Sequence, residues 1–192
     1  MNHPLSSFAH RPVVQVGYLV PDIEAAVHKW VERVGAGPFF IYEHFKPDLI
    51  LHCGEPAQWD HSAAFGQWGS IQLEVIKVHS MSPATLSDQF SATVHRLHHL
   101  TWFSDDVAQE SARLAALGWP EVMQMRMNTG TPSAFNDARA DLGHLIELYP
   151  RANLVAAHYD AIARAAVDWD GARPLRSWGE RPVEGIDLTG MY

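Results

Sequence analysis

Residues 145–149 read LIELY, a strand-like apolar run with the carboxylate of Glu147 at its centre. An isolated charge is costly to bury, so such a group is paired, bound to a metal or neutralised. The same anomaly recurs at Glu74 within IQLEVI, and a third metal-capable side chain, His99, lies within LHHLTWF. One such residue alone is best explained as an edge-strand side chain that faces water. Three of them on three apolar strands predict a metal site walled by a β-sheet.

The chain runs through the same order of elements twice. Strand-type patterns alternate with helical spacing, and Asp22 and Asp106 stand where helix N-caps are expected. The first half reads as strand, helix and three strands, at residues 13–20, 22–34, 39–45, 62–68 and 71–78, with room for a short strand at 49–52. The second half repeats this order at 97–103, 105–117, 121–127, 133–138 and 144–149. Each half is therefore a βαβββ module. A duplication of this kind is stronger evidence for the fold than any single motif.

The predicted division of the chain follows from this repeat. It comprises an N-terminal segment, a first module, a polar connector, a second module and a C-terminal segment, at residues 1–11, 12–79, 80–95, 96–150 and 151–192. Helical spacing of apolar residues predicts a helix over 154–167. Residues 169–192 contain Pro, Gly and scattered aromatics, which fits an ordered arm across this domain or a neighbouring subunit, or a partly disordered tail.

Composition narrows the class of protein. The 192 residues are 47% hydrophobic and 19% charged, an ordinary globular balance, and they suffice for one substantial domain or two small ones. The net charge of -8 disfavours nucleic acid and anionic membrane surfaces as partners. A single cysteine, Cys53, excludes an intrachain disulfide and a cysteine-based zinc site. No run resembles a signal peptide or a membrane span, so we expect a cytoplasmic protein.

Four polar positions are equivalent in the two halves. Gln15 and His99 lie in the first strand of their modules, and Glu74 and Glu147 lie in the fourth. Each repeat thus carries two possible metal ligands, and they occupy matching positions. Such a pattern rarely arises by chance. His98 is predicted to be structural, because adjacent strand residues face opposite sides of a sheet.

Other polar residues near these positions are weaker candidates. Gln72 shares a strand face with Glu74, and it either supports a ligand or is an ordinary polar strand residue. His144 faces away from Glu147 and is therefore a poor ligand candidate. Six aromatic residues could line a pocket, although strand aromatics are more often plain core: Phe40, Tyr42, Phe65, Trp68, Trp102 and Phe135.

These motifs resemble the vicinal oxygen chelate superfamily, which contains glyoxalase I, methylmalonyl-CoA epimerase and extradiol dioxygenases. The resemblance covers roughly residues 12–150. Its first signature, QVGYLVPDIEAA, begins with Gln15 where the family usually has His. IQLEVI places Glu74 in the second ligand slot, and GHLIEL places Glu147 in the last. LHHLTW is close to the epimerase branch, in which the second His of the pair, here His99, binds metal.

The resemblance implies an α+β fold in which two tandem βαβββ modules form one curved, cup-shaped mixed sheet with helices outside. It also implies a divalent metal held by Gln15, Glu74, His99 and Glu147, a set similar to that of some zinc-containing glyoxalase I enzymes. One amide oxygen, two carboxylates and one imidazole suit Zn, Co, Ni, Mn or Fe.

The expected function is that of a metal-dependent lyase or isomerase that acts on a small carbonyl compound through a metal-stabilised enolate. Glu147 or Glu74 would be the base, and we expect a homodimer. Leu19 and Val78 stand where glyoxalase I has Arg and Asn, which counts against a glutathione substrate. A single His in the ligand slots disfavours extradiol chemistry. The alternative is a non-catalytic protein that sequesters a hydrophobic or aromatic compound, and metal content separates the two.

Overall fold

The computed structural model describes residues 11–86, 95–151 and 153–182, and its elements follow the expected order. The first half contributes β1 (Gln15–Leu19), α1 (Ile23–Val34), β2 (Phe39–Phe45), β3 (Leu49–His52), β4 (Glu55–Pro56), β5 (Gln58–Trp68), β6 (Ile71–Ser82) and the 3-10 helix η2 (Ala84–Leu86). The second half contributes β7 (Arg96–Ser104), α3 (Val107–Ala116), β8 (Glu121–Arg126), β9 (Pro132–Asp137), α4 (Arg139–Leu142) and β10 (Leu145–Pro150). These are followed by α5 (Asn153–Ala165), β11 (Leu175–Ser177) and the 3-10 helix η3 (Trp178–Glu180).

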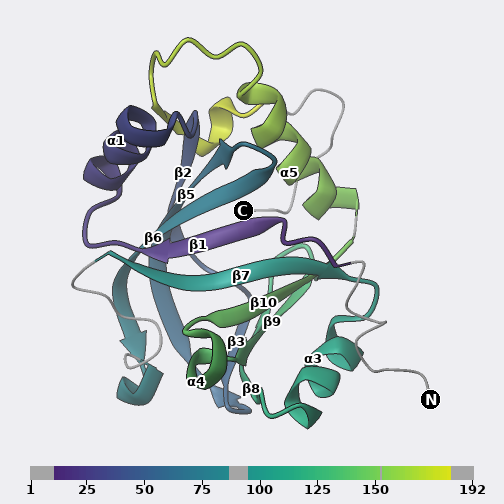
Figure 1. Cartoon of the computed structure of the whole chain (residues 1–192). Coiled ribbons are helices and arrows are strands. Elements are labelled where there is room, and N and C mark those ends of the chain that lie inside the picture. The colour runs from purple at the N-terminus through teal and green to yellow at the C-terminus, as the bar shows by residue number, and fades with distance from the viewer. Residues whose placement is uncertain (1–10, 87–94, 152, 183–192) are drawn as a thin grey trace.

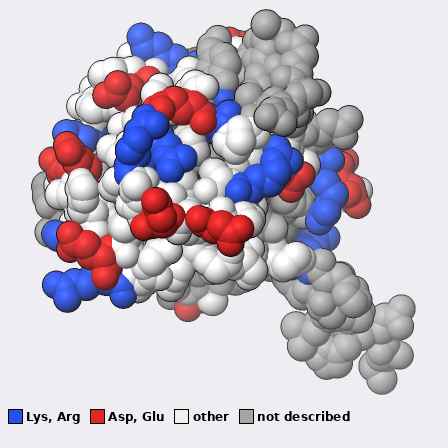
Figure 2. Space-filling model, turned by 90° about the horizontal axis from the view of Figure 1, so that it is seen from above, with Lys and Arg blue, Asp and Glu red and all other residues white. Residues whose placement is uncertain are grey.

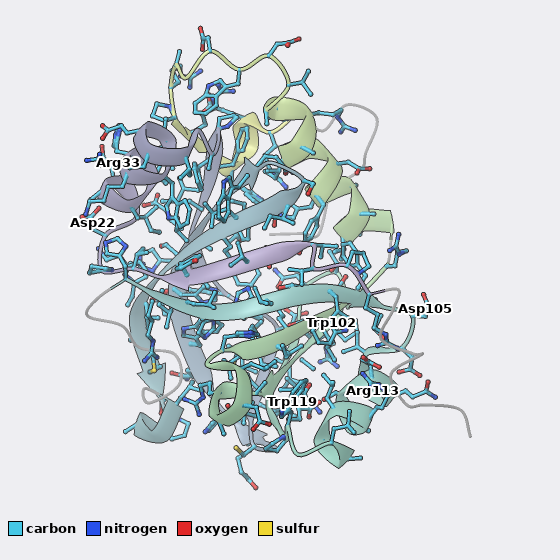
Figure 3. All side chains as sticks on the ribbon, in the orientation of Figure 1. Asp22, Arg33, Trp102, Asp105, Arg113 and Trp119 are labelled. Atoms are coloured by element: carbon cyan, nitrogen blue, oxygen red, sulfur yellow. The ribbon has the colours of Figure 1, made fainter. Side chains whose placement is uncertain are left out.

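The two long helices of the modules begin at the aspartates that the sequence indicates. The Asp22 carboxylate accepts a hydrogen bond from the backbone N–H three residues later at 2.8 Å, and Asp106 does the same for α3 at 2.9 Å. Figure 3 shows Asp22 and Arg33 at the two ends of α1. The helix ends at Gly35, whose φ of 69° lies in the left-handed region that a glycine adopts without strain.

One curved, unclosed mixed sheet carries the fold and confirms the predicted fold class. The described strands form it in the order β11-β2-β5-β6-β1-β7-β10-β9-β8-β3-β4. Each module pairs its first and last strands in parallel, β1 with β6 and β7 with β10. The modules join where β1 and β7 pair antiparallel, side by side across the middle of Figure 1.

Some strands differ from the prediction, among them β5, which begins at Gln58 and not at residue 62. The sequence predicted that the fourth strand ends at Val78, but β6 continues to Ser82 because its backbone stays paired with β5 down to Gln58. The side chains after Val78 are mostly polar, but backbone pairing does not require apolar side chains. The predicted strand therefore ended too early. The short strand over 49–52 is confirmed as β3, and it pairs with β8 of the other module. The two-residue β4 was not predicted.

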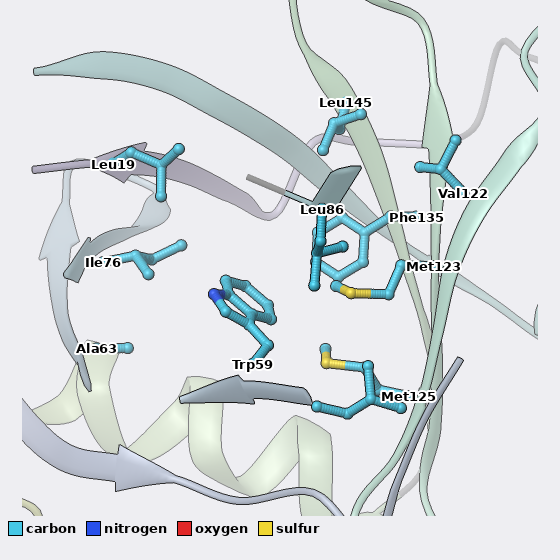
Figure 4. Packing of buried hydrophobic residues seen from close by; sticks show 11 residues of the cluster. Leu19, Trp59, Ala63, Ile76, Leu86, Val122, Met123, Met125, Phe135 and Leu145 are labelled. Atoms are coloured by element: carbon cyan, nitrogen blue, oxygen red, sulfur yellow. The ribbon is translucent and has the colours of Figure 1, made fainter. Parts of the chain in front are cut away.

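Hydrophobic clusters lie on both faces of the sheet. Within the cup, Trp59 packs among residues of β6, η2, β8 and β9, and Figure 4 shows its indole between Ile76 and the ring of Phe135. On the outer face, one cluster packs α1 against the first module and another packs α3 against the second. The burial of these clusters determines which face of the sheet is concave. It therefore determines which strand side chains point into the cup.

The C-terminal segment covers the cup of its own domain. The predicted helix over 154–167 is α5, at Asn153–Ala165. β11 pairs in parallel with β2, and the Trp178 ring contacts those of Tyr42 and Phe65 at centroid distances of 5.6 Å and 5.3 Å. Residues 169–182 thus form an arm across this domain, and the rest of the predicted arm lies outside the described residues.

Charges of both signs are mixed on the surface. In the view of Figure 2, Lys and Arg side chains lie beside Asp and Glu. Across the segments that the structure describes, no helix combines the length and the apolarity that a membrane crossing requires.

Candidate metal centre

The four predicted ligands come from four neighbouring strands, in the order β6-β1-β7-β10. Three residues lie in line across β1, β7 and β10 and form a first row. They are Gln15, Thr101 and Glu147, since Gln15 and Glu147 each pair opposite Thr101. The Thr101 hydroxyl lies 2.9 Å from Gln15 Oε1 and 2.9 Å from Glu147 Oε2, and it can donate to either oxygen. Sequence reasoning missed Thr101, although its position two residues after His99 places it on the same strand face.

A second row consists of Glu74, Gly17 and His99. Strand pairing places Glu74 on one side of Gly17 and His99 on the other. The imidazole lies directly over the glycine, since a Cβ built there would stand 2.1 Å from His99 Cε1. Gly17 therefore provides the space in which the ring leans toward the other ligands. A glycine inside a strand is the sequence signal for such a close approach.

The ligand atoms meet around the imidazole. His99 Nε2 lies 3.3 Å from Glu74 Oε2, 3.3 Å from Glu147 Oε2 and 3.3 Å from Gln15 Oε1. All four side chains are buried, with exposed fractions between 1% and 8%. The structure thus brings together all four residues that the sequence singled out.

Burial perturbs the charges of this cluster. It raises the pKa of Glu74 to about 8. Burial also raises the pKa of Glu147 to about 7. The charge of Glu74 raises this pKa further, whereas His99 and the hydrogen bonds from hydroxyl groups lower it. Burial lowers the pKa of His99, although Glu147 opposes this shift. The cavity therefore disfavours bare charges, and a cation placed among these atoms would reverse the shifts of the carboxylates.

His98 does not face away from His99, so the prediction of opposite faces is wrong. The pairing of β1 with β7 shifts register between Gly17 and Tyr18, and His98 is the extra residue of this bulge. Both rings turn toward Phe135, and His98 Nδ1 lies 2.8 Å from His99 Nδ1. This contact leaves His99 Nε2 directed at the carboxylates, as a ligand-orienting hydrogen bond does.

A buried chain of polar side chains extends from the site to α5. Gln15 Nε2 donates to Gln72 Oε1 at 2.6 Å, and Gln72 Nε2 lies 3.3 Å from His158 Nε2. Gln72 is thus a partner of a predicted ligand and not an ordinary strand residue. His144, by contrast, contacts the backbone oxygen of Leu145, consistent with its predicted place outside the site.

Two adjoining hollows open onto the cluster. The outer one has an empty volume of about 760 Å³, which includes the solvent space at its open mouth. Its lining is mainly aromatic and aliphatic, with Lys46 as its cation, and includes Tyr42, Phe45, Phe65, Val155, Tyr159 and Trp178. The inner hollow is lined by His99 and Glu147, and Glu74 lines both. A small, largely apolar compound would therefore reach the four polar side chains from the mouth of the cup.

A second group of metal-capable residues, His44, Asp60 and His79, is not arranged as a metal centre. The two imidazoles stack with centroids 4.4 Å apart and planes inclined by only 24°, so their in-plane lone pairs do not converge on one point. His44 Nδ1 is already bonded to the Asp60 carboxylate at 2.9 Å, and His79 Nε2 to the Ser62 hydroxyl at 2.7 Å.

The curved sheet of two βαβββ modules, with polar ligands at the meeting point of its parallel strand pairs, defines a vicinal oxygen chelate fold. The family model of the Glyoxalase/Bleomycin resistance protein/Dioxygenase superfamily matches residues 14–135. The chain therefore belongs to this superfamily, whose members include metal-dependent epimerases and dioxygenases. A search of curated proteins found no match.

Solved structures support the fold. Methylmalonyl-CoA epimerase from Mycobacterium tuberculosis aligns with a TM-score of 0.52 at 18% identity, over 76% of this chain and 91% of that one. A hypothetical protein from Bacillus halodurans aligns with a TM-score of 0.54 at 14% identity, over 75% of this chain and 96% of the other. At these identities the likeness establishes the fold and not the reaction.

The side chains present fit a divalent cation. The ligand atoms of Glu74, His99 and Glu147 lie within 4.8 Å of one another, with Gln15 Oε1 beside them. The ion pairs of the described residues bring His99, and no Lys or Arg, to these carboxylates. A divalent cation would supply the missing positive charge, and three oxygens with one imidazole nitrogen suit Zn, Co, Ni, Mn or Fe.

Proposed function

We propose that this protein is a metal-dependent lyase or isomerase that acts on a small carbonyl compound. The proposal rests on the convergence of Gln15, Glu74, His99 and Glu147 at the floor of an apolar hollow. A divalent ion bound there would supply Lewis acidity toward a substrate oxygen.

Proton removal beside the carbonyl is assigned to Glu147. Its carboxylate faces the inner hollow, and its Oε2 lies 2.9 Å from the Thr101 hydroxyl, which can donate to it. A base must lie within hydrogen-bond reach of the proton that it removes, and the hollow brings a substrate to this oxygen. We assign the return of the proton to Glu74, a role supported by its position in the lining of both hollows.

A substrate that fills the hollows would limit the access of water to the reacting atoms, because the walls of the cup are largely apolar. Phe45 and Phe65 line both hollows, and α5 adds Tyr159 to the outer one. Exclusion of water strengthens the interaction between a carboxylate and a substrate proton. The apolar lining favours a compact aromatic or aliphatic carbonyl compound.

Metal content and proton exchange test the proposal. Protein purified without added metal should contain about one divalent ion per chain by elemental analysis. Incubation with a panel of 2-oxo and acyl-CoA compounds in deuterated water should then label at least one of them next to its carbonyl. Protein that takes up no Zn, Co, Ni, Mn or Fe after purification, even when each is supplied, would overturn the proposal.

The aromatic lining also favours a second function, the sequestration of a hydrophobic compound without turnover. Trp178 and Tyr42 contact each other at the outer hollow, and an aromatic guest could stack beside them. Stable binding of aromatic compounds by metal-free protein, with no deuterium exchange when metal is present, would favour this function over the enzyme.

A further inference from the structure

We propose that His158 and Gln72 are positioning residues that turn the amide of Gln15 so that its oxygen faces the cation. The inference deepens the proposed function and rests on it, because it assigns to α5 a part in the same metal centre. Neither residue occupies a predicted ligand position, and His158 lies outside the two repeated modules.

An amide ligand poses a problem that a carboxylate does not. Only its oxygen can bind a cation, whereas its NH2 group offers two donors. Rotation by 180° exchanges the two ends with almost no change of shape. Without a cation, the reversed Gln15 would direct its NH2 group at the carboxylates of Glu74 and Glu147, which accept hydrogen bonds. The competing orientation is therefore attractive, and the metal-binding orientation needs support from elsewhere.

The contacts of Gln15 supply that support, because both ends of its amide have partners that fit the metal-binding orientation. Its Nε2 donates to Gln72 Oε1 at 2.6 Å, while its Oε1 lies 2.9 Å from the Thr101 hydroxyl, which can donate to it. Both amides are 2% exposed, so water offers no alternative partners. Reversal of Gln72 alone would place two NH2 groups face to face, so the two amides must reverse together. Whatever holds Gln72 therefore also holds Gln15.

His158 holds Gln72. Its Nε2 lies 3.3 Å from Gln72 Nε2. With the Gln72 amide in this orientation, the imidazole accepts from Gln72 if its own proton is on Nδ1, an atom without a hydrogen-bond partner among the described residues. Phe65 and Trp178 flank the ring at centroid distances of 5.1 Å and 4.8 Å, which fixes its plane. Burial lowers the pKa of His158 to about 3, with Arg181 adding to the shift, so the acceptor lone pair persists at neutral pH. The chain of bonds thus runs from His158 through Gln72 to Gln15 with each donor directed away from the cation.

The first test measures zinc affinity by competition with a chromophoric chelator. His158→Phe removes the acceptor and should weaken zinc binding at least about 10-fold, the usual effect of losing a partner behind a metal ligand. His158→Gln retains an acceptor of similar reach and should restore most of the affinity. His52→Phe is the matched control, because His52 is also 8% exposed and its hydrogen bonds to described residues lie in the β3–β8 region, away from the cluster. Equal zinc affinity in wild type and His158→Phe would overturn the inference.

The second test separates amide direction from general damage to the pocket. Gln15→Glu presents an oxygen whichever way it rotates, so zinc binding in this background should no longer depend on position 158. His158→Phe should then weaken zinc binding in the Gln15 protein and leave it unchanged in the Gln15→Glu protein. An equal loss in both backgrounds would assign His158 to packing and overturn the positioning role.

The third test needs no variant and so does not depend on folding of a mutant. Nitrogen chemical shifts distinguish the two tautomers of a neutral histidine. In the zinc-loaded protein, His158 should carry its proton on Nδ1, and a proton on Nε2 would contradict the proposed direction. Failure of the wild type to bind any metal would instead refute the proposed function, so the two failures are distinguishable.

Discussion

Single residues decide what the centre can bind, because they control where individual atoms of the cluster lie. Thr101 holds Gln15 and Glu147 with one hydroxyl, and Gly17 admits the His99 ring by having no side chain. Neither residue can bind a metal strongly itself. The chemistry of the site therefore depends on small neighbours that place the ligand atoms.

The Glu147→Gln substitution distinguishes between two roles of Glu147, that of a base and that of a metal ligand. Gln is nearly isosteric and can still offer an oxygen to a cation, but it cannot take up a proton. We expect deuterium exchange into the substrate to fall by at least about 100-fold, the lower end of general-base effects, while the fold persists. Glu43→Gln, an exposed change on β2, is the control and should exchange normally. Undiminished exchange in Glu147→Gln would move the role of base to Glu74.

Gln15→His tests the first ligand position. It replaces the amide by the imidazole that the family usually carries there, and imidazole binds zinc without a preferred amide direction. We expect zinc affinity to be retained or increased and the exchange activity to persist. Loss of zinc binding in this variant would show that the site depends on the amide itself.

His61 should make stability depend on pH. Burial lowers its pKa to about 4, whereas an unfolded His titrates near 6.5. The folded protein thus resists protonation, so stability is complete above pH 6.5 and falls as the pH drops toward 4. The loss from this one group should be about 1 kcal/mol per pH unit in that window. Urea unfolding at pH 7 and 5.5 with chelator present should give a smaller pH difference for His61→Phe than for wild type, and parallel profiles would contradict this.

At the scale of elements, the closeness of β1 and β7 is what assembles the site. These two strands join the modules, and their regular register places Gln15 opposite Thr101 and Gly17 opposite His99. The bulge begins beyond this stretch, at His98, and brings the His98 ring beside His99 instead of turning it to the opposite face of the sheet. The site is therefore a property of the junction between the repeats.

Gly17→Ala should damage this junction. The added Cβ would lie 2.1 Å from a His99 ring atom, so the ring must move or the strands must separate. We expect a loss of about 1–3 kcal/mol in the free energy of unfolding, as for other overpacked sites, together with weaker zinc binding. Gly179→Ala is the control, since a Cβ there meets no atom within 4 Å, and it should change neither quantity. Normal zinc affinity in Gly17→Ala would show that His99 tolerates displacement.

At the scale of the whole molecule, a bound ion should stabilise the fold, because its ligands come from both modules and from four strands. An ion that binds only the folded state adds about 2.7 kcal/mol at a hundredfold excess over its Kd. Exhaustive chelation should therefore lower the Tm by several degrees, and zinc should restore it. An unchanged Tm after verified metal removal would argue against a tightly bound ion. The Glu74→Gln protein, with a weakened site, should respond less to chelator than wild type.

The sequence by itself determined the repeat of elements and, with the family resemblance, the fold class, and it singled out the four polar residues that the structure brings together. Local patterns suffice for these, because alternation and helical spacing record which residues are buried, and Glu74 and Glu147 are anomalies within apolar runs. Only the tertiary structure decided the bulge at His98, because the register of β1 with β7 depends on both strands at once. The link from Gln72 to His158 also required it, since these residues lie 86 positions apart and no local pattern relates them. Contacts between distant segments depend on how the packed elements cross, and that geometry is set by the whole core.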